Sequence, residues 1–135
     1  FNIITPMKRI NISSGSPYEK PIGFSRAVRI GNIISVSGTA PIDNDGHTVY
    51  PGDLYRQTDH CIRIIEKAIY DAGGKPENII RTRVYLKNAS DWKEAARAHG
   101  KYFSGIRPAC TFVEISRFVE ADWLVEMEAD CVIAE

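Results

Sequence analysis

The last third of the chain alternates apolar and polar residues, and this pattern constrains the fold most strongly. From residue 123 onward the apolar positions are Trp123, Val125, Met127, Ala129, Cys131 and Ile133, and the acidic positions between them are Glu126, Glu128 and Asp130. Successive side chains of a strand point to opposite faces, so this strand has an apolar face and an acidic face. A second alternating stretch, 109–115, begins after Pro108. We predict that the two strands form a closing hairpin.

Length and charge restrict the class of protein. A chain of 135 residues, 44% of them hydrophobic, predicts one domain. The 17 basic and 17 acidic side chains cancel, so we expect no nucleic-acid partner. Three scattered cysteines predict neither disulfides nor a metal site, and no apolar run approaches the roughly 20 residues of a membrane span. We therefore expect a cytoplasmic protein without a membrane partner.

Residues 1–6 precede Met7, and we interpret them as an extension of a domain that covers 7–135.

Turn residues divide the first half of the chain into strands. Lys8 to Ile12 predicts a short first strand, and residues 13–17 form a loop rich in serine and glycine. The dipeptide Gly31-Asn32 separates the β-rich runs 24–30 and 33–37, which predicts a hairpin.

Two amphipathic helices follow. We expect Asp53 to cap the first, whose apolar residues recur at spacings of three and four until Gly73-Gly74 ends it. The strand 79–86 comes next, with Ile80, Thr82, Val84 and Leu86 on one face. Ser90 is expected to cap the second helix. These elements predict an α+β layer whose helices cover one face of the sheet, and the partly bare opposite face, with Tyr85 and Ile115, predicts an oligomer.

Five short motifs occur in order between residues 22 and 133: Ser37-Gly38, Ala72-Gly73-Gly74, the stretch from Arg81 to Lys87, Pro108-Ala109, and the stretch from Val125 to Ala129. As an ordered set they resemble the Rid family of YjgF-like reactive intermediate deaminases. The resemblance implies a chorismate-mutase-like fold, with a six-stranded mixed sheet and two helices on one face. It also implies a homotrimer whose sheets form a barrel, with small-molecule clefts at the subunit boundaries.

The same resemblance implies a chemistry that uses neither a metal nor an organic cofactor. Deaminating members hydrolyse imines and enamines derived from amino acids, and a glutamate on the last strand helps to hold the reacting water. Glu126 occupies that position, and a positioned carboxylate suits the task. Ser37 and Gly38 would contact the ligand through backbone or hydroxyl groups.

Three positions depart from the family pattern. Cys110 stands directly after Pro108-Ala109, where deaminating members carry an arginine that binds the substrate carboxylate with two parallel donors. Phe24 replaces a tyrosine of the same cleft, and Ala96 replaces an asparagine on the second helix. We interpret the chain as a divergent subgroup in which the loss of the arginine argues against imine deamination.

Each candidate site residue has two interpretations. Cys110 is either a reactive thiol or a small residue that lines a cleft or the core. Arg107 and Arg26 either take over anion binding or are solvated arginines near strand ends. His99 is either a general base or a packed histidine with one satisfied nitrogen. Glu126 either orients water or pairs with a basic side chain.

Three functions remain open at this level. The first is a protein that binds a small anionic metabolite between subunits and hydrolyses reactive imines or enamines. The second is a non-catalytic protein that binds or protects a metabolite in the same cleft. The third is an endoribonuclease or translation inhibitor, which zero net charge and the lack of a basic stripe disfavour.

Overall fold

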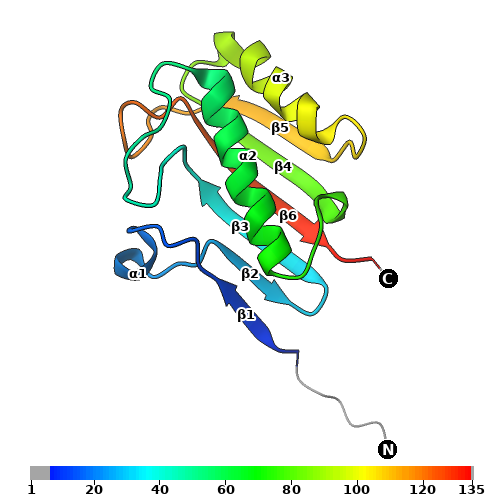
Figure 1. The fold of residues 1–135 in the computed structure, drawn as a ribbon. Helices are drawn as coiled ribbons and strands as arrows, with labels where there is room; N and C mark the ends of the chain where they lie inside the picture. Colours follow the sequence, from blue (N-terminus) through cyan, green and yellow to red (C-terminus); the bar gives the residue numbers. More distant parts are fainter. Residues whose placement is uncertain (1–6, 135) are drawn as a thin grey trace, which may run out of the picture.

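A six-stranded mixed sheet carries the fold, and the computed structural model describes residues 7–134 (Figure 1). The strand order is β1-β2-β3-β6-β4-β5, and all neighbours are antiparallel except β4 and β5, which are parallel. The strands are β1 (Arg9–Ile12), β2 (Ala27–Ile30), β3 (Ile33–Thr39), β4 (Ile79–Leu86), β5 (Ala109–Glu114) and β6 (Val125–Val132).

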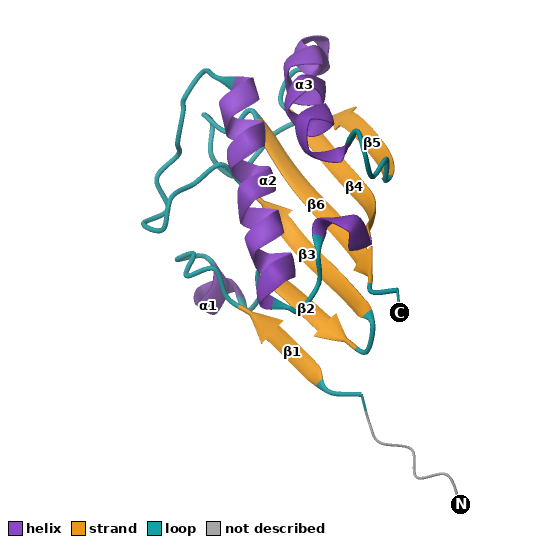
Figure 2. Ribbon diagram, turned by 45° about the vertical axis from the view of Figure 1, so that its right-hand side comes forward, coloured by secondary structure: helices purple, strands orange, loops and turns teal. Residues whose placement is uncertain are grey.

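Two long helices lie side by side on one face of the sheet, which confirms the predicted α+β layer (Figure 2). They are α2 (Leu54–Asp71) and α3 (Trp92–Phe103), and the shorter elements are α1 (Glu19–Ile22), η1 (Pro76–Asn78) and η2 (Ala89–Asp91). No helix among residues 7–134 is long and apolar enough to cross a lipid bilayer. The interpretation of residues 1–6 as an extension concerns residues outside the described part of the chain.

β6 lies in the middle of the sheet, so the predicted closing hairpin is wrong. It pairs with β3 on one side and with β4 on the other. β5 instead pairs in parallel with β4, to which α3 connects it. The predicted apolar face of β6 is confirmed, because its apolar side chains are buried under the helices. Alternation defines the faces of a strand but not its neighbours, and the loop 115–124 is long enough to carry the chain past β4.

The long helix begins and ends as its sequence predicts. The side chain of Asp53 accepts a hydrogen bond from the backbone nitrogen of Arg56 at 3.0 Å, which caps the first turn. The buried residues of α2 are Leu54, Gln57, Thr58, Cys61, Ile62, Ile65, Ala68 and Ile69. Gly73 follows the helix with a φ of 89°, a conformation that favours glycine. The apolar residues of α2 pack on the apolar face of β6 and form the main core with it.

Three local predictions differ from the structure. Ser90 lies in η2, and α3 begins at Trp92 without a side-chain cap. Ile80 is 53% exposed, because the pairing of β4 with β6 is irregular between Ile79 and Arg81 and turns its side chain away from the core. β2 begins at Ala27 rather than at residue 24. Ile115 and Tyr85 are partly buried, and both pack against a second, smaller core, which consists of Ala40, Ile42, Phe118 and Trp123.

The face of the sheet opposite the helices is mixed in character. Arg83 on β4 forms an ion pair with Asp130 on β6 at 3.0 Å, and the Tyr85 hydroxyl donates to Glu128. The same face exposes Ile33, at the start of β3, and Val113, on the edge strand β5, at 55% and 41%. Charged cross-strand pairs thus occupy the centre of this face, and apolar side chains flank them.

Candidate functional site

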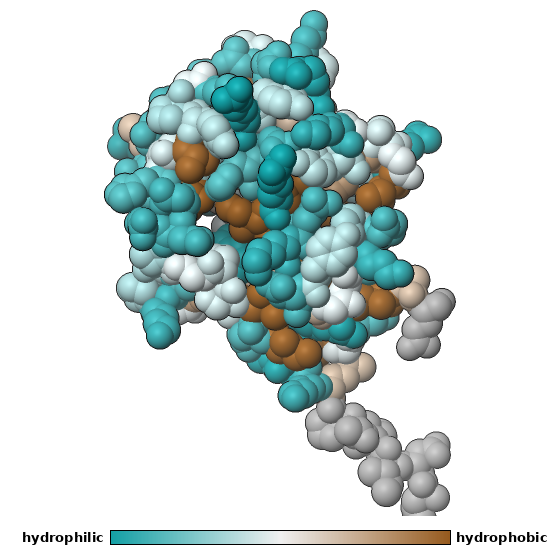
Figure 3. Space-filling model, in the orientation of Figure 1, coloured by the Kyte–Doolittle hydropathy of each residue, from teal (hydrophilic) through white to brown (hydrophobic). Residues whose placement is uncertain are grey.

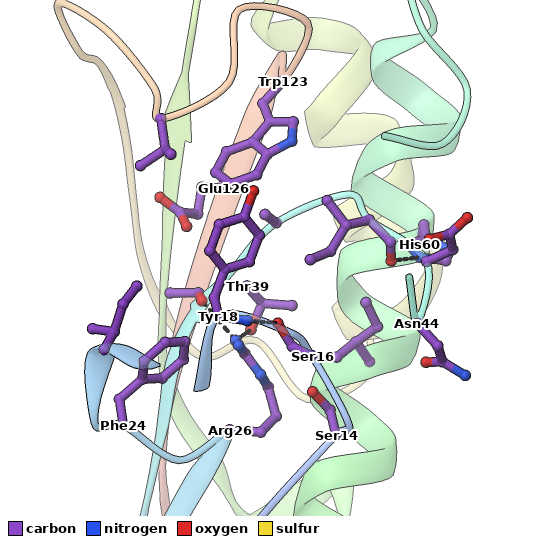
Figure 4. Close-up of a pocket in the computed structure, with 17 residues that line it drawn as sticks. Ser14, Ser16, Tyr18, Phe24, Arg26, Thr39, Asn44, His60, Trp123 and Glu126 are labelled. Carbon is purple, nitrogen blue, oxygen red and sulfur yellow. Dashed lines mark hydrogen bonds between the residues drawn. The ribbon is translucent and has the colours of Figure 1, made fainter. Parts of the chain in front are cut away.

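A cavity of about 490 Å³ opens where β3 ends and β6 begins. Its walls come from four segments that are distant in sequence: the part of the chain around α1, the loop that follows β3, one side of α2, and the loop 115–124 (Figure 4). About half of the lining side chains are apolar or aromatic, and apolar atoms contribute most of the surface of the cavity. A concave, mostly apolar site with a few polar groups is typical of a small-molecule site.

Glu126 and Gly38 meet on the sheet side of the cavity. Gly38 lies in the irregular end of β3, and a Cβ atom there would lie 3.2 Å from Oε2 of Glu126. Glycine therefore leaves the room that the carboxylate occupies. Burial raises the pKa of Glu126, the positive charge of Arg26 opposes the rise, and Glu128 adds to it. A half-buried carboxyl group with a raised pKa is suited to accept and return a proton near neutral pH.

Arg26 is a buried residue with four neighbours, not a solvated arginine. Its side chain is only 5% exposed, and Nη1 donates to the carbonyl oxygen of Gly38 at 2.6 Å and to Oγ1 of Thr39 at 3.0 Å. Nε lies 4.0 Å from a carboxylate oxygen of Glu19 and has no hydrogen-bond partner among residues 7–134. The guanidinium group lies 5.4 Å from the ring centre of Phe24. Arg26 thereby holds the backbone that positions Gly38 beside Glu126.

Glu19 anchors the short helix α1 to the sheet. Oε2 of Glu19 accepts hydrogen bonds from the backbone nitrogen of Ser14 at 3.1 Å and from its hydroxyl group at 2.6 Å. Burial raises the pKa of Glu19, but the hydrogen bonds from Ser14 and Ser13 and the charge of Arg26 outweigh this effect and lower it. The ionised pair Glu19 and Arg26 fixes the lower wall of the cavity.

Two aromatic side chains form another wall. Tyr18 and Trp123 pack edge to face with ring centres 6.3 Å apart. Trp123 is 3% exposed, and its Nε1 has no hydrogen-bond partner among residues 7–134. On the α2 side, Nε2 of His60 lies 2.8 Å from the carbonyl oxygen of Ile42. No sequence pattern assigns these residues to the site, because only tertiary packing brings the four wall segments together.

The predicted site residues fall into two groups. Phe24, Arg26, Gly38 and Glu126 line the cavity. Ser37 neighbours them, but its hydroxyl group donates to the carbonyl oxygen of Ser25 at 2.6 Å and does not line the cavity.

The other predicted residues lie near α3 and β5. Cys110 is exposed on β5, which is an edge strand, and Arg107 is exposed in the turn before it with a φ of 57°. His99 packs against Phe103, and its Nε2 lies 2.8 Å from Oγ1 of Thr82. Burial lowers the pKa of His99. None of these three side chains lines the cavity of its own protomer.

One surface loop gathers groups of the kind that bind metals. Ligand-type atoms of Asp43, Asp45 and His47 lie within 4.8 Å of one another, and all three residues are exposed. Oδ1 of Asp43 accepts hydrogen bonds from the backbone nitrogens of Asp45 and His47, both at 2.9 Å. The carboxylate of Asp43 thus closes the loop.

The buried thiols contribute no nucleophile, since burial raises the pKa of Cys131 to about 12 and raises that of Cys61 further.

Comparison with known proteins finds the same fold and related sequences. The profile of the endoribonuclease L-PSP family matches residues 18–133. A RutC family protein of Pyrococcus abyssi is 37% identical over 111 residues, which cover 82% of this chain and 87% of that protein. The 3-aminoacrylate deaminase RutC of Acinetobacter baylyi is 29% identical over 121 residues, or 89% and 94% of the two chains.

A solved structure has a closely similar fold. Rv2704 of Mycobacterium tuberculosis, described as a member of the YjgF/YER057c/UK114 family, superposes with a TM-score of 0.84 at 36% identity. The match covers 93% of this chain and all of that chain. The six-stranded mixed sheet with helices is therefore shared along nearly the full length of both proteins.

Proposed function

The chain belongs to the YjgF-like endoribonuclease L-PSP family, as its motifs predicted, and we propose that its cavity binds a small metabolite and hydrolyses a reactive imine or enamine there. The observation that carries the proposal is the half-buried carboxyl group of Glu126, whose pKa is raised by burial in an apolar cavity. The positions of Gly38 and Arg26, which hold this group in place, support the same interpretation. The deaminase named among the relatives adds support.

The proposed reaction needs one proton acceptor that also returns the proton. The carboxylate of Glu126 takes a proton from water while the water oxygen attacks the imine carbon. Glu126 passes that proton to the former imine nitrogen, so the tetrahedral intermediate carries a hydroxyl group and an amino group on one carbon. Glu126 then takes the hydroxyl proton and passes it to the amino group, the C–N bond breaks, ammonia leaves, and a carbonyl group remains. The apolar walls exclude bulk water and keep the pKa of Glu126 high.

We propose further that the cavity is completed in a homotrimer. Ile33 and Val113 are exposed on the face opposite the helices, and an apolar surface of this kind is typical of an interface between subunits. Cys110 and Arg107 are exposed at the β5 edge, outside the cavity of their own protomer. In the proposed trimer, the β5 edge of a neighbouring protomer closes the cavity with these residues. Sedimentation equilibrium tests this assembly, and a stable monomer at micromolar concentration contradicts it.

A non-catalytic binding protein is the second candidate. Arg26 is the only arginine or lysine that lines the cavity among residues 7–134, and it already donates hydrogen bonds to Gly38 and Thr39 and forms an ion pair with Glu19. An anionic ligand would therefore need a cation from a neighbouring protomer. The endoribonuclease activity in the family's name is the weakest candidate function, because a formal net charge of zero does not attract the phosphate backbone of RNA.

Imines generated in situ by an amino acid oxidase test the proposed hydrolysis. We expect the protein to release ammonia faster than buffer alone, and the Glu126→Gln variant to lose activity by about 10²-fold or more. Glu128→Gln is the matched control, because Glu128 lies on the same face of β6 but bonds to Tyr85 instead. Ammonia release no faster than in buffer would leave only the binding function. Equal losses in both variants would remove the specific role of Glu126.

A further inference from the structure

The cavity is larger than a small imino acid needs. Its volume of about 490 Å³ corresponds to roughly 16 water molecules at ~30 Å³ each. A three- or four-carbon imino acid has only about six or seven non-hydrogen atoms, so it would occupy less than half of this space by the same measure. A ligand that fills the cavity must therefore carry a large group in addition to its reacting end.

Apart from the polar side chains of Ser14, Ser16, Asp43, Asn44 and His60, the walls away from Glu126 are apolar. Ile42 and Ile64 line the α2 side, and Tyr18 and Trp123 line the aromatic side. Ile22 and Val119 also line the cavity and are 68% and 77% exposed. Figure 3 shows apolar side chains at the surface in the hollow beside α2, with hydrophilic side chains around them. The space left by a small substrate is thus suited to an apolar group and not to a second charged group.

One buried donor in this wall lacks a partner. The indole nitrogen of Trp123 is buried and has no acceptor among residues 7–134. A buried N–H group without an acceptor destabilises the folded protein, because its hydrogen bond to water is lost and not replaced. Figure 4 shows Glu126 on the β6 side of the cavity and His60 on the α2 side, with the indole nitrogen of Trp123 turned toward the α2 side. An acceptor atom on the large group would satisfy this donor while the reacting end lies at Glu126.

We propose that the substrates of this cavity carry an aromatic or comparably bulky apolar side chain with a hydrogen-bond acceptor at its far end. This inference rests on the proposed function of the same cavity and names its substrate class. The imine or enamine carbon lies at Glu126, the ring packs between Ile64 and Trp123, and the acceptor receives the N–H group of Trp123. The imine of tyrosine has this form, the imine of phenylalanine has the ring without the acceptor, and the imines of alanine and 2-aminobutyrate have neither.

The stable 2-oxo acid products serve as binding probes for the full-length protein. Calorimetric titrations would compare pyruvate, phenylpyruvate and 4-hydroxyphenylpyruvate. Burial of the ring predicts that phenylpyruvate binds at least about 10-fold tighter than pyruvate. A hydrogen bond from Trp123 to the hydroxyl oxygen predicts a further gain of about 3-fold to 10-fold for 4-hydroxyphenylpyruvate.

Two variants separate the ring from its acceptor. Trp123→Phe keeps an aromatic wall but removes the donor, so it should abolish the gain from the hydroxyl group and retain the preference for a ring. Ile64→Phe fills the α2 side and should weaken the aromatic acids by about 10-fold while pyruvate is unaffected. Lys67→Phe is the matched control, because Lys67 is exposed on the same helix and does not line the cavity.

The outcomes distinguish this inference from the proposed function. Imine hydrolysis without any preference among the three acids would overturn the substrate class and leave the function of Glu126 standing. A ring preference that Ile64→Phe does not reduce would also overturn it, because the ring would then lie elsewhere. If the protein neither binds these acids nor hydrolyses any imine, both proposals fail together.

Discussion

Replacing Gly38 by alanine would test how closely the carboxylate of Glu126 is held. The new Cβ atom would lie 3.2 Å from Oε2 and 3.4 Å from Cδ of Glu126, closer than ordinary van der Waals contact. Gly38 does not adopt a positive φ, so alanine introduces no backbone strain. The carboxylate must therefore move by a few tenths of an ångström, because Arg26 holds the backbone of Gly38 through its carbonyl oxygen.

The expected effects on stability and on activity differ in size. The end of a glutamate side chain can shift at little cost, so the free energy of unfolding should change by no more than about 1 kcal/mol. Misplacement of a catalytic group by about 1 Å can cost 10²-fold in rate, so a smaller shift predicts a loss of about 10-fold. The added methyl group also excludes water from the carboxyl group and should raise the pKa of Glu126 further.

Chemical denaturation and the pH dependence of imine hydrolysis measure the two effects separately. Gly38→Ala should unfold close to the wild type, with a lower kcat and with the acidic limb of its pH profile moved to higher pH. Gly100→Ala is the matched control, since a Cβ at this position in α3 meets nothing within 4 Å and alanine favours helices. Full activity with an unchanged profile in Gly38→Ala would refute the reasoning, and so would destabilisation by several kcal/mol.

Three further predictions concern stability. Arg26→Met leaves the buried carboxylate of Glu19 without its cation. The free energy of unfolding, measured by urea titration, should fall by about 3–5 kcal/mol, and a fall of less than about 1 kcal/mol would contradict this. Burial lowers the pKa of His99 in the folded protein, so folding favours the neutral imidazole. The contribution of His99 to the free energy of unfolding is complete above the ordinary histidine pKa of about 6.5, and it is lost as the pH falls through the lower pKa of the folded state. Urea midpoints between pH 4.5 and 7.5 should therefore rise with pH, and His99→Gln should rise less steeply. Asp53→Ala removes the cap of α2 and should cost about 1 kcal/mol, whereas an unchanged thermal midpoint would argue against the cap.

The elements that local patterns describe were predicted well. The cap at Asp53, the glycine after α2 and the hairpin at Gly31-Asn32 each depend on residues close in sequence, and the structure has all three. The errors arose where a distant partner decides the outcome. Ile80 follows the alternation of β4, yet the irregular pairing with β6 exposes it.

The candidate site divides in the same way. The family resemblance directed attention to Phe24, Gly38 and Glu126, and these residues line one cavity. No sequence pattern indicated that Arg26 would be buried against Glu19, because the ion pair joins α1 to the start of β2. Trp123 was recognised as apolar, but its unsatisfied indole nitrogen is visible only once the surrounding loops are in place.

The sequence alone determined which residues form strands and helices, and which face of each is apolar, because side-chain periodicity is a local property of the backbone. The tertiary structure decided that β6 lies between β3 and β4. In this position the apolar face of β6 packs on α2, and Glu126 on its other face lies beside Gly38 of β3. It also decided the size and the walls of the cavity, which four segments build together. Contacts between segments far apart in the chain create these features, and the pattern of any single segment does not contain them.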